Sequence, residues 1–387
     1  MSVASELVAH VPCALMSRLS PATGLALVTL AACASPHSAE FTRAMRAADD
    51  SEGKGQYLEA AKRFDAAAAS TTRLVDQDEA RVSAARMLAR GGDRRGALAR
   101  FDALARAIPP GPEACSAAYE SALLRVDGEE PEVGWRGMDA MLHRCPNGGE
   151  ARPAMRHLLA HKDEAEGPPA TLTYLRQLRK ELGGTDREEE IAYEIALRLE
   201  RTGDPRGARD AFMAMAARWP YPDGSLWDDA LFHASLIDEA TGHPADAVAD
   251  LQQMLSRREH AIISGSAERP RYEPAQLRIA ELYRDRLGDR AHAEEAFHTL
   301  FAKFPDCPFR DRGLYEEAAM LRADGKVDAA CERLGTLVKE VPDSRYVPCA
   351  LEQCPGIRAR PGPNAPKMCH PYIHRELANA SPPQPAP

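Results

Sequence analysis

The sequence has 387 residues, of which 44% are hydrophobic and 6% aromatic, and its 49 basic and 58 acidic residues give a formal net charge of −9. No long run of either sign occurs, which argues against a nucleic-acid-binding protein, because such proteins carry a clustered basic face. Abundant alanine and few aromatic residues favour closely packed helices.

The N-terminal segment has the pattern of an export signal. Met16-Ser-Arg18 precedes a short apolar run that begins at Gly24 and ends before Cys33. This run is well short of the ~20 residues that a membrane-spanning helix needs. Residues 1–15 lack Lys and Arg and contain Glu6, so we expect translation to begin at Met16.

The end of this segment, Leu30-Ala31-Ala32-Cys33, resembles the lipoprotein box of bacteria. The resemblance implies cleavage before Cys33 and acylation of its thiol. Because Ala34 and not Asp follows, it also implies sorting to the outer membrane, facing the periplasm. Several acyl chains make a stable membrane anchor. The alternative is an ordinary signal peptide, cut near Ala34 or Ala39, that releases a periplasmic or secreted protein.

After a tether at residues 34–40, an internal repeat extends over residues 41–342. A marker residue, usually alanine, opens the second helix of each unit, and the first four steps between markers are 37 residues each. The markers are Ala60, Ala97, Gly134, Thr171, Ala208, Ala247, Ala293 and Ala330. Four positions later stand Phe64, Phe101, Met138, Leu175, Phe212, Leu251, Phe297 and Leu334.

Glycine stands five positions before most markers, as at Gly203, and proline often stands twelve positions after, as at Pro220. Glycine suits the tight turn between antiparallel helices, alanine allows close approach, and proline ends the second helix. The pattern predicts an all-α fold of about eight helix-turn-helix repeats, stacked into a right-handed superhelix with a groove.

These positions closely resemble the tetratricopeptide repeat, with Ala208, Phe212 and Met215 at its second-helix positions. The resemblance implies that first helices line the groove and bind partner proteins there. The candidate groove residues are Arg86, Arg90, Tyr193 and Arg201.

Several places depart from the pattern. Gly134 and Thr171 replace the marker alanine, so we expect the third and fourth repeats to be distorted, and residues 49–52 predict a ragged first helix. An insertion at residues 256–272 is either a binding loop or a spacer. Residues 343–375 form a cysteine-bearing capping segment with a short helix over 346–353, and 376–387 form a Pro-rich, disordered tail.

Export permits disulfide bonds. Cys115 opens the first helix of a hairpin and Cys145 ends its second helix, so the two lie at the same end of an antiparallel pair. We therefore expect a Cys115–Cys145 disulfide. Cys307 and Cys331 lie at opposite ends of their hairpin, on the order of 20 Å apart, too far for a bond.

Cysteines also gather near the C-terminus, at Cys349, Cys354 and Cys369. One pair among them, with Cys369 as the natural member, would hold the tail to the last helix. The alternative is a zinc site formed by these cysteines with His370 or His374.

No motif in the sequence indicates a reaction. His157 and His161 are one helical turn apart, but no Glu follows the first, so they lack the metalloprotease pattern and fit a solvated helix face. We find no phosphate loop and no nucleophile elbow, and expect no cofactor and no metal. The sequence therefore predicts a non-catalytic scaffold for other proteins of the bacterial envelope, supporting assembly of an outer-membrane or envelope complex. The alternatives are a periplasmic module that coordinates cell-wall or division machinery, and an enzyme with an unrecognised site.

Overall fold

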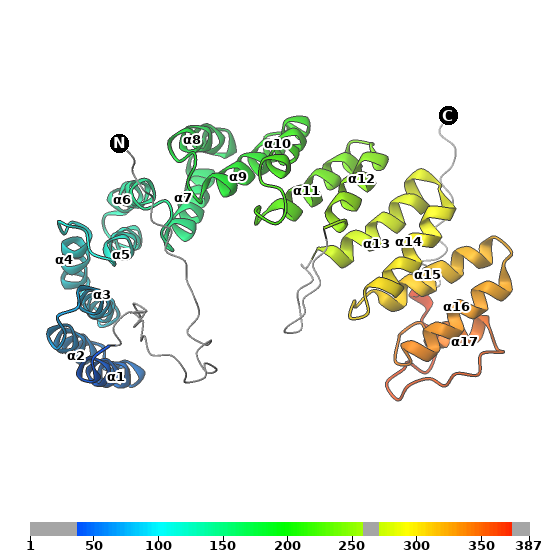
Figure 1. Ribbon diagram of the computed structural model, residues 1–387, viewed down its shortest axis with the longest axis horizontal. Helices are drawn as coiled ribbons and strands as arrows, with labels where there is room; N and C mark the ends of the chain where they lie inside the picture. The colour runs from blue at the N-terminus through cyan, green and yellow to red at the C-terminus, as the bar shows by residue number, and fades with distance from the viewer. Residues whose placement is uncertain (1–36, 258–270, 374–387) are drawn as a thin grey trace, which may run out of the picture. The chain divides into compact units, whose positions relative to one another are not determined.

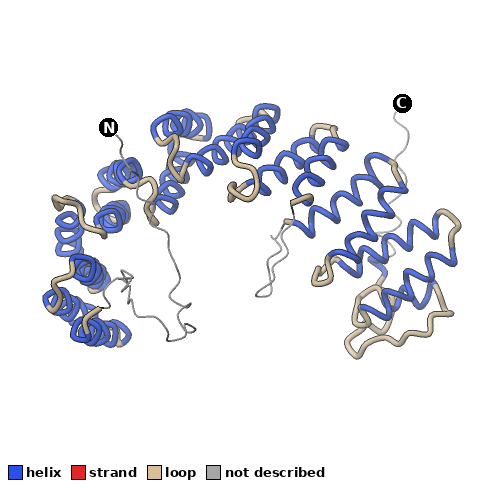
Figure 2. The backbone as a smooth tube through the Cα atoms, in the orientation of Figure 1, coloured by secondary structure: helices blue, strands red, loops and turns tan. Residues whose placement is uncertain are grey.

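The computed structural model describes residues 37–257 and 271–373, and every regular element in these two ranges is a helix (Figure 1; Figure 2). The predicted all-α repeat fold is therefore confirmed. The chain divides into two units, Met1–Gly91 and Gly92–Pro387. Within each unit, every described helix packs against the next one along the chain.

The first unit contains three helices, α1 (Ala39–Gly53), α2 (Tyr57–Ala69) and α3 (Leu74–Arg90). The second unit contains α4 (Arg94–Ala105), α5 (Ala114–Val126), α6 (Pro131–Arg144), α7 (Ala151–Ala165), α8 (Pro168–Glu181), α9 (Glu188–Arg201), α10 (Pro205–Arg218), α11 (Trp227–Ala240), α12 (Pro244–Leu255), α13 (Tyr272–Leu282), the π-helical turn η1 (Tyr283–Leu287), α14 (Arg290–Lys303), α15 (Arg310–Ala323), α16 (Val327–Glu340) and α17 (Val347–Gln353).

The marker residues of the repeat form the core. The six marker alanines and Thr171 have no exposed surface, and the large apolar residue four positions after each marker is at most 2% exposed. One helical turn separates the two positions, so they lie on one face. Burying each Phe or Leu contributes about 1.5–3 kcal/mol. The repeated positions in the sequence are therefore the positions that are buried between the helices.

The turn before α10 shows why the sequence repeats at this point. Gly203 has a φ of +81°, a conformation that side chains with a Cβ rarely adopt. Asp204 follows as the N-cap of α10, and its carboxylate accepts a 2.9 Å hydrogen bond from the Gly207 amide. Pro205 occupies the first helical position, where its missing N–H costs nothing.

The third and fourth repeats each form two helices, and α7 and α8 of the fourth repeat contact each other much less extensively than α5 and α6 of the third. A Cβ at Gly134 would lie 2.6 Å from the Val126 amide nitrogen and 2.7 Å from the Ala122 carbonyl oxygen, so α5 and α6 approach more closely there than alanine permits. Thr171 is buried, and its hydroxyl donates to the Gly167 carbonyl at 3.2 Å. Closer helix approach at Gly134 and a hydroxyl hydrogen bond at Thr171 therefore accommodate the residues that stand in place of the marker alanine.

Both ends of the described chain also differ in detail from the expectation. The first helix is continuous, and it begins inside the expected tether, because Ser38 caps it by accepting a 3.0 Å hydrogen bond from the Phe41 amide. The capping helix forms as α17, with Tyr346 as its N-cap. The predicted signal segment and Pro-rich tail lie outside the described residues, as does most of the predicted insertion.

The seventh repeat contains one feature that the sequence analysis did not predict. Its first helix ends in the π-helical turn η1, closed by a 2.8 Å hydrogen bond from the Asp289 amide to the Tyr283 carbonyl. A π-helical turn accommodates one extra residue in a helix. The marker Ala293 follows Gly288 by the usual five positions and is fully buried.

Candidate functional site

A cluster of aromatic and apolar side chains lies on the first helices of the fifth and sixth repeats. Tyr193 of α9 meets His233 of α11 edge to face, with ring centroids 5.7 Å apart and an interplanar angle of 80°. Phe232 is half-buried beside it, and Leu236, one turn further along α11, is 41% exposed. We call Tyr193, Phe232, His233 and Leu236 the first-helix patch.

A core residue, Phe212, contacts two side chains of this patch. Phe212, fully buried on α10, stacks on His233 with centroids 5.1 Å apart and touches the edge of Tyr193 at 5.6 Å. The orientations of Tyr193 and His233 are therefore fixed by a residue that the repeat pattern requires. Aromatic pairs of this kind contribute about 0.5–1.5 kcal/mol beyond their buried area.

One ion pair borders the patch. The Arg271 guanidinium, just before α13, pairs with Asp229 of α11 and lies over the Phe232 ring, 4.8 Å from its centroid. The cation faces the negative π surface of the ring. Arg271 thereby links the sixth repeat to the seventh and provides a charged edge beside apolar side chains.

The patch itself carries little charge at neutral pH. Burial, and to a smaller degree the Arg271 charge, lowers the pKa of His233 below its ordinary value. Burial, with the nearby Asp229 carboxylate, raises the pKa of Tyr193 to about 12. Neutral aromatic side chains with a polar atom at one end are common at the centres of protein interfaces.

Ion pairs also join the first helices of successive repeats. Asp163 accepts from Arg198 at 2.9 Å, Glu281 accepts from Arg312 at 2.7 Å, and Glu316 accepts from Arg284 at 2.8 Å. Glu239 similarly pairs with Arg278. Opposite charges are therefore paired between neighbouring repeats.

The four residues predicted for the groove lie in different settings. Tyr193 belongs to the first-helix patch, and Arg201 pairs with Asp163 at 3.1 Å. Arg86 and Arg90 are exposed on α3, in the first unit. Arg90 pairs with Glu52 and lies 4.3 Å from the centroid of the Tyr57 ring. Their role in a groove remains a prediction.

Sequence reasoning missed Phe232, His233 and Leu236 as surface residues. The signal was present, because Phe232 precedes Ala247 by the same interval that separates Tyr193 from Ala208. Both residues therefore occupy the same repeat position on successive first helices. Aligning the first helices, as well as the second, would have found the patch.

The two histidines of α7 lie against aromatic rings. His161 stacks on Trp135, with centroids 4.2 Å apart and planes 7° from parallel, and His157 lies 6.4 Å from the Tyr119 ring. In the described residues, one group of three possible metal ligands occurs, formed by His37, Asp76 and Glu79. The buried Asp76 already contacts His37 and Arg73, at 3.0 and 3.3 Å, which accounts for its charge without a metal.

Six cysteines of the described chain form three disulfides. Cys115 and Cys145 are bonded, with Cα atoms 6.1 Å apart, which is the pairing that the hairpin geometry predicts. Cys349 is bonded to Cys369, so Cys369 holds the end of the capping segment against α17, as expected. The Cys331–Cys354 bond was not predicted.

These bonds exclude the alternative zinc site in this structure. Zinc binds thiolates, and Cys349, Cys354 and Cys369 are all in disulfides. Cys307, which is buried, has no disulfide partner, and burial raises the pKa of its thiol to about 12. The thiol therefore stays protonated at neutral pH.

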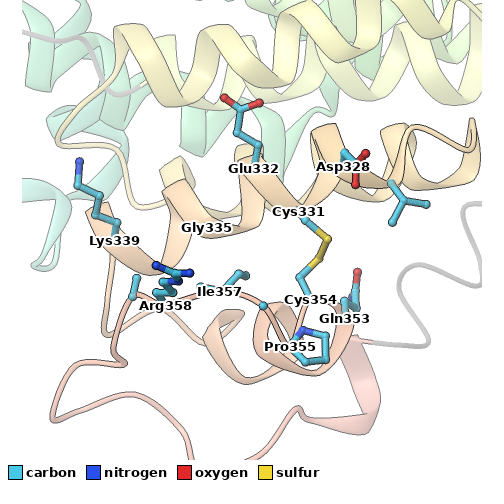
Figure 3. Close-up of a pocket in the computed structure, with 13 residues that line it drawn as sticks. Asp328, Cys331, Glu332, Gly335, Lys339, Gln353, Cys354, Pro355, Ile357 and Arg358 are labelled. Carbon is cyan, nitrogen blue, oxygen red and sulfur yellow. A yellow bond between two sulfur atoms is a disulfide. The ribbon is translucent and has the colours of Figure 1, made fainter.

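A pocket of about 710 Å³ lies between α16 and the segment 354–359 (Figure 3). Asp328 and Glu332 come from the first half of α16, and Lys339 from its last turn. Arg358 and Ile357 come from the facing segment, and the Cys331–Cys354 disulfide joins the two walls. The pocket lies in the last repeat, on elements other than those that carry the first-helix patch.

The paired helices, glycine turns and apolar second-helix core define a helical-repeat protein. Residues 274–306, the seventh hairpin, match the tetratricopeptide repeat family. The seven other units follow the same spacing of marker residue and large apolar residue as this matched hairpin, and most share its glycine position. The comparison with curated proteins found no match.

Solved structures of similar proteins include the C-terminal part of a repeat-containing protein from Cytophaga hutchinsonii, 12% identical, covering 70% of this chain and 99% of that one with a TM-score of 0.41. A tetratricopeptide repeat protein from Parabacteroides merdae is also 12% identical and covers 71% and 98%, with a TM-score of 0.33. The nearly identical repeats of a putative kinesin light chain from Podosopora anserina are 17% identical and cover 47% and 90%, with a TM-score of 0.34.

The predicted lipidation site, Cys33, lies outside the described residues. In the part of the chain that the structure describes, no helix combines the length and apolar character needed to cross a membrane.

Proposed function

We propose that this protein is a non-catalytic scaffold that binds a partner protein on the first-helix patch. The observation that carries the proposal is the exposed Leu236 next to the Tyr193–His233 contact, which Phe212 holds in place. Rigid aromatic side chains beside an apolar one can bind without losing much conformational freedom, and such residues dominate interface energies. Arg271 at the edge supplies a charge that orients the partner.

The proposed location is the bacterial envelope, with Cys33 lipid-modified and the repeats facing the periplasm from the outer membrane. The Leu30–Cys33 motif supports the anchor. Three disulfides support an oxidising compartment, because such bonds rarely persist in a reducing cytosol. A scaffold placed there would serve the assembly of an outer-membrane or envelope complex.

The anchor is tested by metabolic labelling with an alkyne-bearing fatty acid. The wild-type protein should be labelled and should fractionate with the outer membrane, whereas Cys33→Ser should be unlabelled. Cys307→Ser, at a free cysteine of the described chain, is the matched control and should keep the label. An unlabelled wild-type protein, or one whose mature N-terminus lies beyond Cys33, would contradict the proposed lipid anchor. Neither result would bear on the proposed binding surface.

The binding surface is tested by a photocrosslinking amino acid placed at Leu236 in cells. The proposal predicts a discrete crosslinked protein, identified by mass spectrometry, that disappears when His233→Asp is added. A crosslinker at Val133, which is equally exposed (41%) on the second helix α6, is the control and should not capture it. Equal capture at both positions would reject the patch.

A further inference from the structure

The Cys331–Cys354 disulfide lies at a pocket and is more accessible than the Cys349–Cys369 disulfide of the same cap. Its sulfur atoms join the two walls of the pocket between α16 and the segment 354–359 (Figure 3), and Cys331 is half-buried. By contrast, Cys349 is fully buried and Cys369 is 8% exposed. The pocket volume, about 710 Å³, leaves room for an incoming side chain.

A cation lies on one side of this disulfide. The Arg322 guanidinium donates to Cys354 Sγ across 3.9 Å and to the Gln353 carbonyl oxygen across 3.1 Å. A guanidinium beside sulfur stabilises the thiolate that forms when the bond opens. In thiol–disulfide exchange, the sulfur that forms the more stable thiolate leaves faster. Cys354 is therefore the leaving group, and the more exposed Cys331 is the sulfur that is attacked.

We propose that Cys331–Cys354 is a thiol-exchange site for a dithiol reductant, which enters through this pocket. A thiolate of the reductant attacks Cys331 Sγ, a mixed disulfide forms, the Cys331–Cys354 bond breaks, and its electron pair remains on Cys354. The second thiolate of the reductant then attacks the mixed disulfide and releases Cys331. The reductant leaves as an internal disulfide, having given two electrons and two protons to the two cysteines.

The consequence of opening this bond is local. Cys331–Cys354 links α16 directly to the start of the segment 354–359. The Cys349–Cys369 bond still holds the end of the capping segment to α17, whose Val347 and Ala350 are fully buried. Reduction therefore frees one face of the last repeat while the cap stays attached. The inference does not depend on the lipid anchor or on the first-helix patch.

The test is the rate at which each disulfide opens in the intact, oxidised protein. Dithiothreitol is added for short times, new thiols are alkylated, and peptide mass spectrometry assigns them. Cys331–Cys354 should open at least about tenfold faster than the buried Cys349–Cys369 bond in the same molecules, because attack requires access. An equal or slower rate would overturn the proposal.

Two further measurements test the direction of attack. Arg322→Gln should slow opening of Cys331–Cys354 by about threefold to tenfold, whereas Arg360→Gln, at an exposed arginine of the same cap, should leave the rate unchanged. With glutathione in place of dithiothreitol, the mixed disulfide should form on Cys331. Equal rates in the two variants, or an adduct mainly on Cys354, would refute the role of Arg322. Far-UV circular dichroism confirms that both variants are folded.

Discussion

Tyr193 and His233 come from successive first helices and meet edge to face, with ring centroids 5.7 Å apart. Both rings also contact Phe212, which the repeat places in the core. The surface that we propose for binding is therefore built directly on the packing that defines the repeat. Changes in the core and changes at the surface should have separable effects.

Replacing Phe212 with Ala tests the core. The substitution removes a fully buried ring and should lower the free energy of unfolding by about 3–5 kcal/mol. Urea unfolding, followed by circular dichroism, measures the change. Leu236→Ala is the surface comparison and should change stability by less than about 0.5 kcal/mol. Similar losses for both would mean that Leu236 belongs to the core.

His233 should make stability fall in mild acid. Burial and Arg271 lower its pKa in the folded state, so the unfolded chain binds more protons as the pH falls through 6.5, the ordinary value. The contribution of neutral His233 is complete above that value and is lost below it. His233→Phe should therefore reduce the loss of stability between pH 7.5 and 5.

His143 is the natural control, because its pKa shift has the opposite sign. Burial alone would lower this pKa, but hydrogen bonds to the Asp139 carbonyl and Glu181 raise it. Its stabilising contribution is present at low pH and is lost as the pH rises above the ordinary value. His143→Gln should steepen the loss of stability in acid. The same direction of change in both variants would contradict these assignments.

Asp250 should destabilise the fold at alkaline pH. Its side chain is buried near Asp238, and burial, opposed by Arg209 and reinforced by Asp238, raises its pKa to about 7. The folded state therefore holds a proton that the unfolded state releases near pH 4, and stability falls as the pH rises through this window. Asp250→Asn should add about 1–3 kcal/mol at pH 8 and less at pH 5. Asp210→Asn, at an exposed position of α10, should show no such pH-dependent gain.

Replacing Gly134 with alanine tests whether the third repeat requires glycine at its marker position. Although alanine is the residue found at most markers, Gly134→Ala should cost about 1–3 kcal/mol, because the new Cβ meets backbone atoms of α5. Gly335→Ala is the matched control on α16, where a Cβ would have no atom within 4 Å. It should stabilise by about 0.5–1 kcal/mol. A gain at both positions would show that α5 and α6 can separate without cost.

The repeat pattern was sufficient to predict the helices because burial repeats with it. Glycine, alanine and the large apolar residue four positions later report which face is buried, and Ala208 and Phe212 are buried accordingly. The Cys115–Cys145 pairing was predictable for the same reason, since both residues lie at one end of a single hairpin. Properties fixed within one repeat could be predicted from the sequence.

Contacts between repeats were harder to predict. Cys331 pairs with Cys354, which lies beyond the last repeat, so reasoning within one hairpin could not find it. The turn η1 was not predicted either, because the repeat pattern places Gly288 and the marker Ala293 but does not show how the preceding helix ends. The first-helix patch depends on how the rings of α9 and α11 are oriented toward one another. A sequence pattern shows only the helix face on which each residue lies.

The most direct test of the central claim is the affinity for the partner captured at Leu236. Leu236→Asp and Phe232→Ala should each weaken binding by about tenfold to a hundredfold in calorimetry with purified proteins, at unchanged thermal stability for Leu236→Asp. Val133→Asp, which places the same charge on α6, should bind like the wild-type protein. Wild-type affinity in both patch variants, or an equal loss in Val133→Asp, would contradict the claim that the first helices of the fifth and sixth repeats form the binding surface.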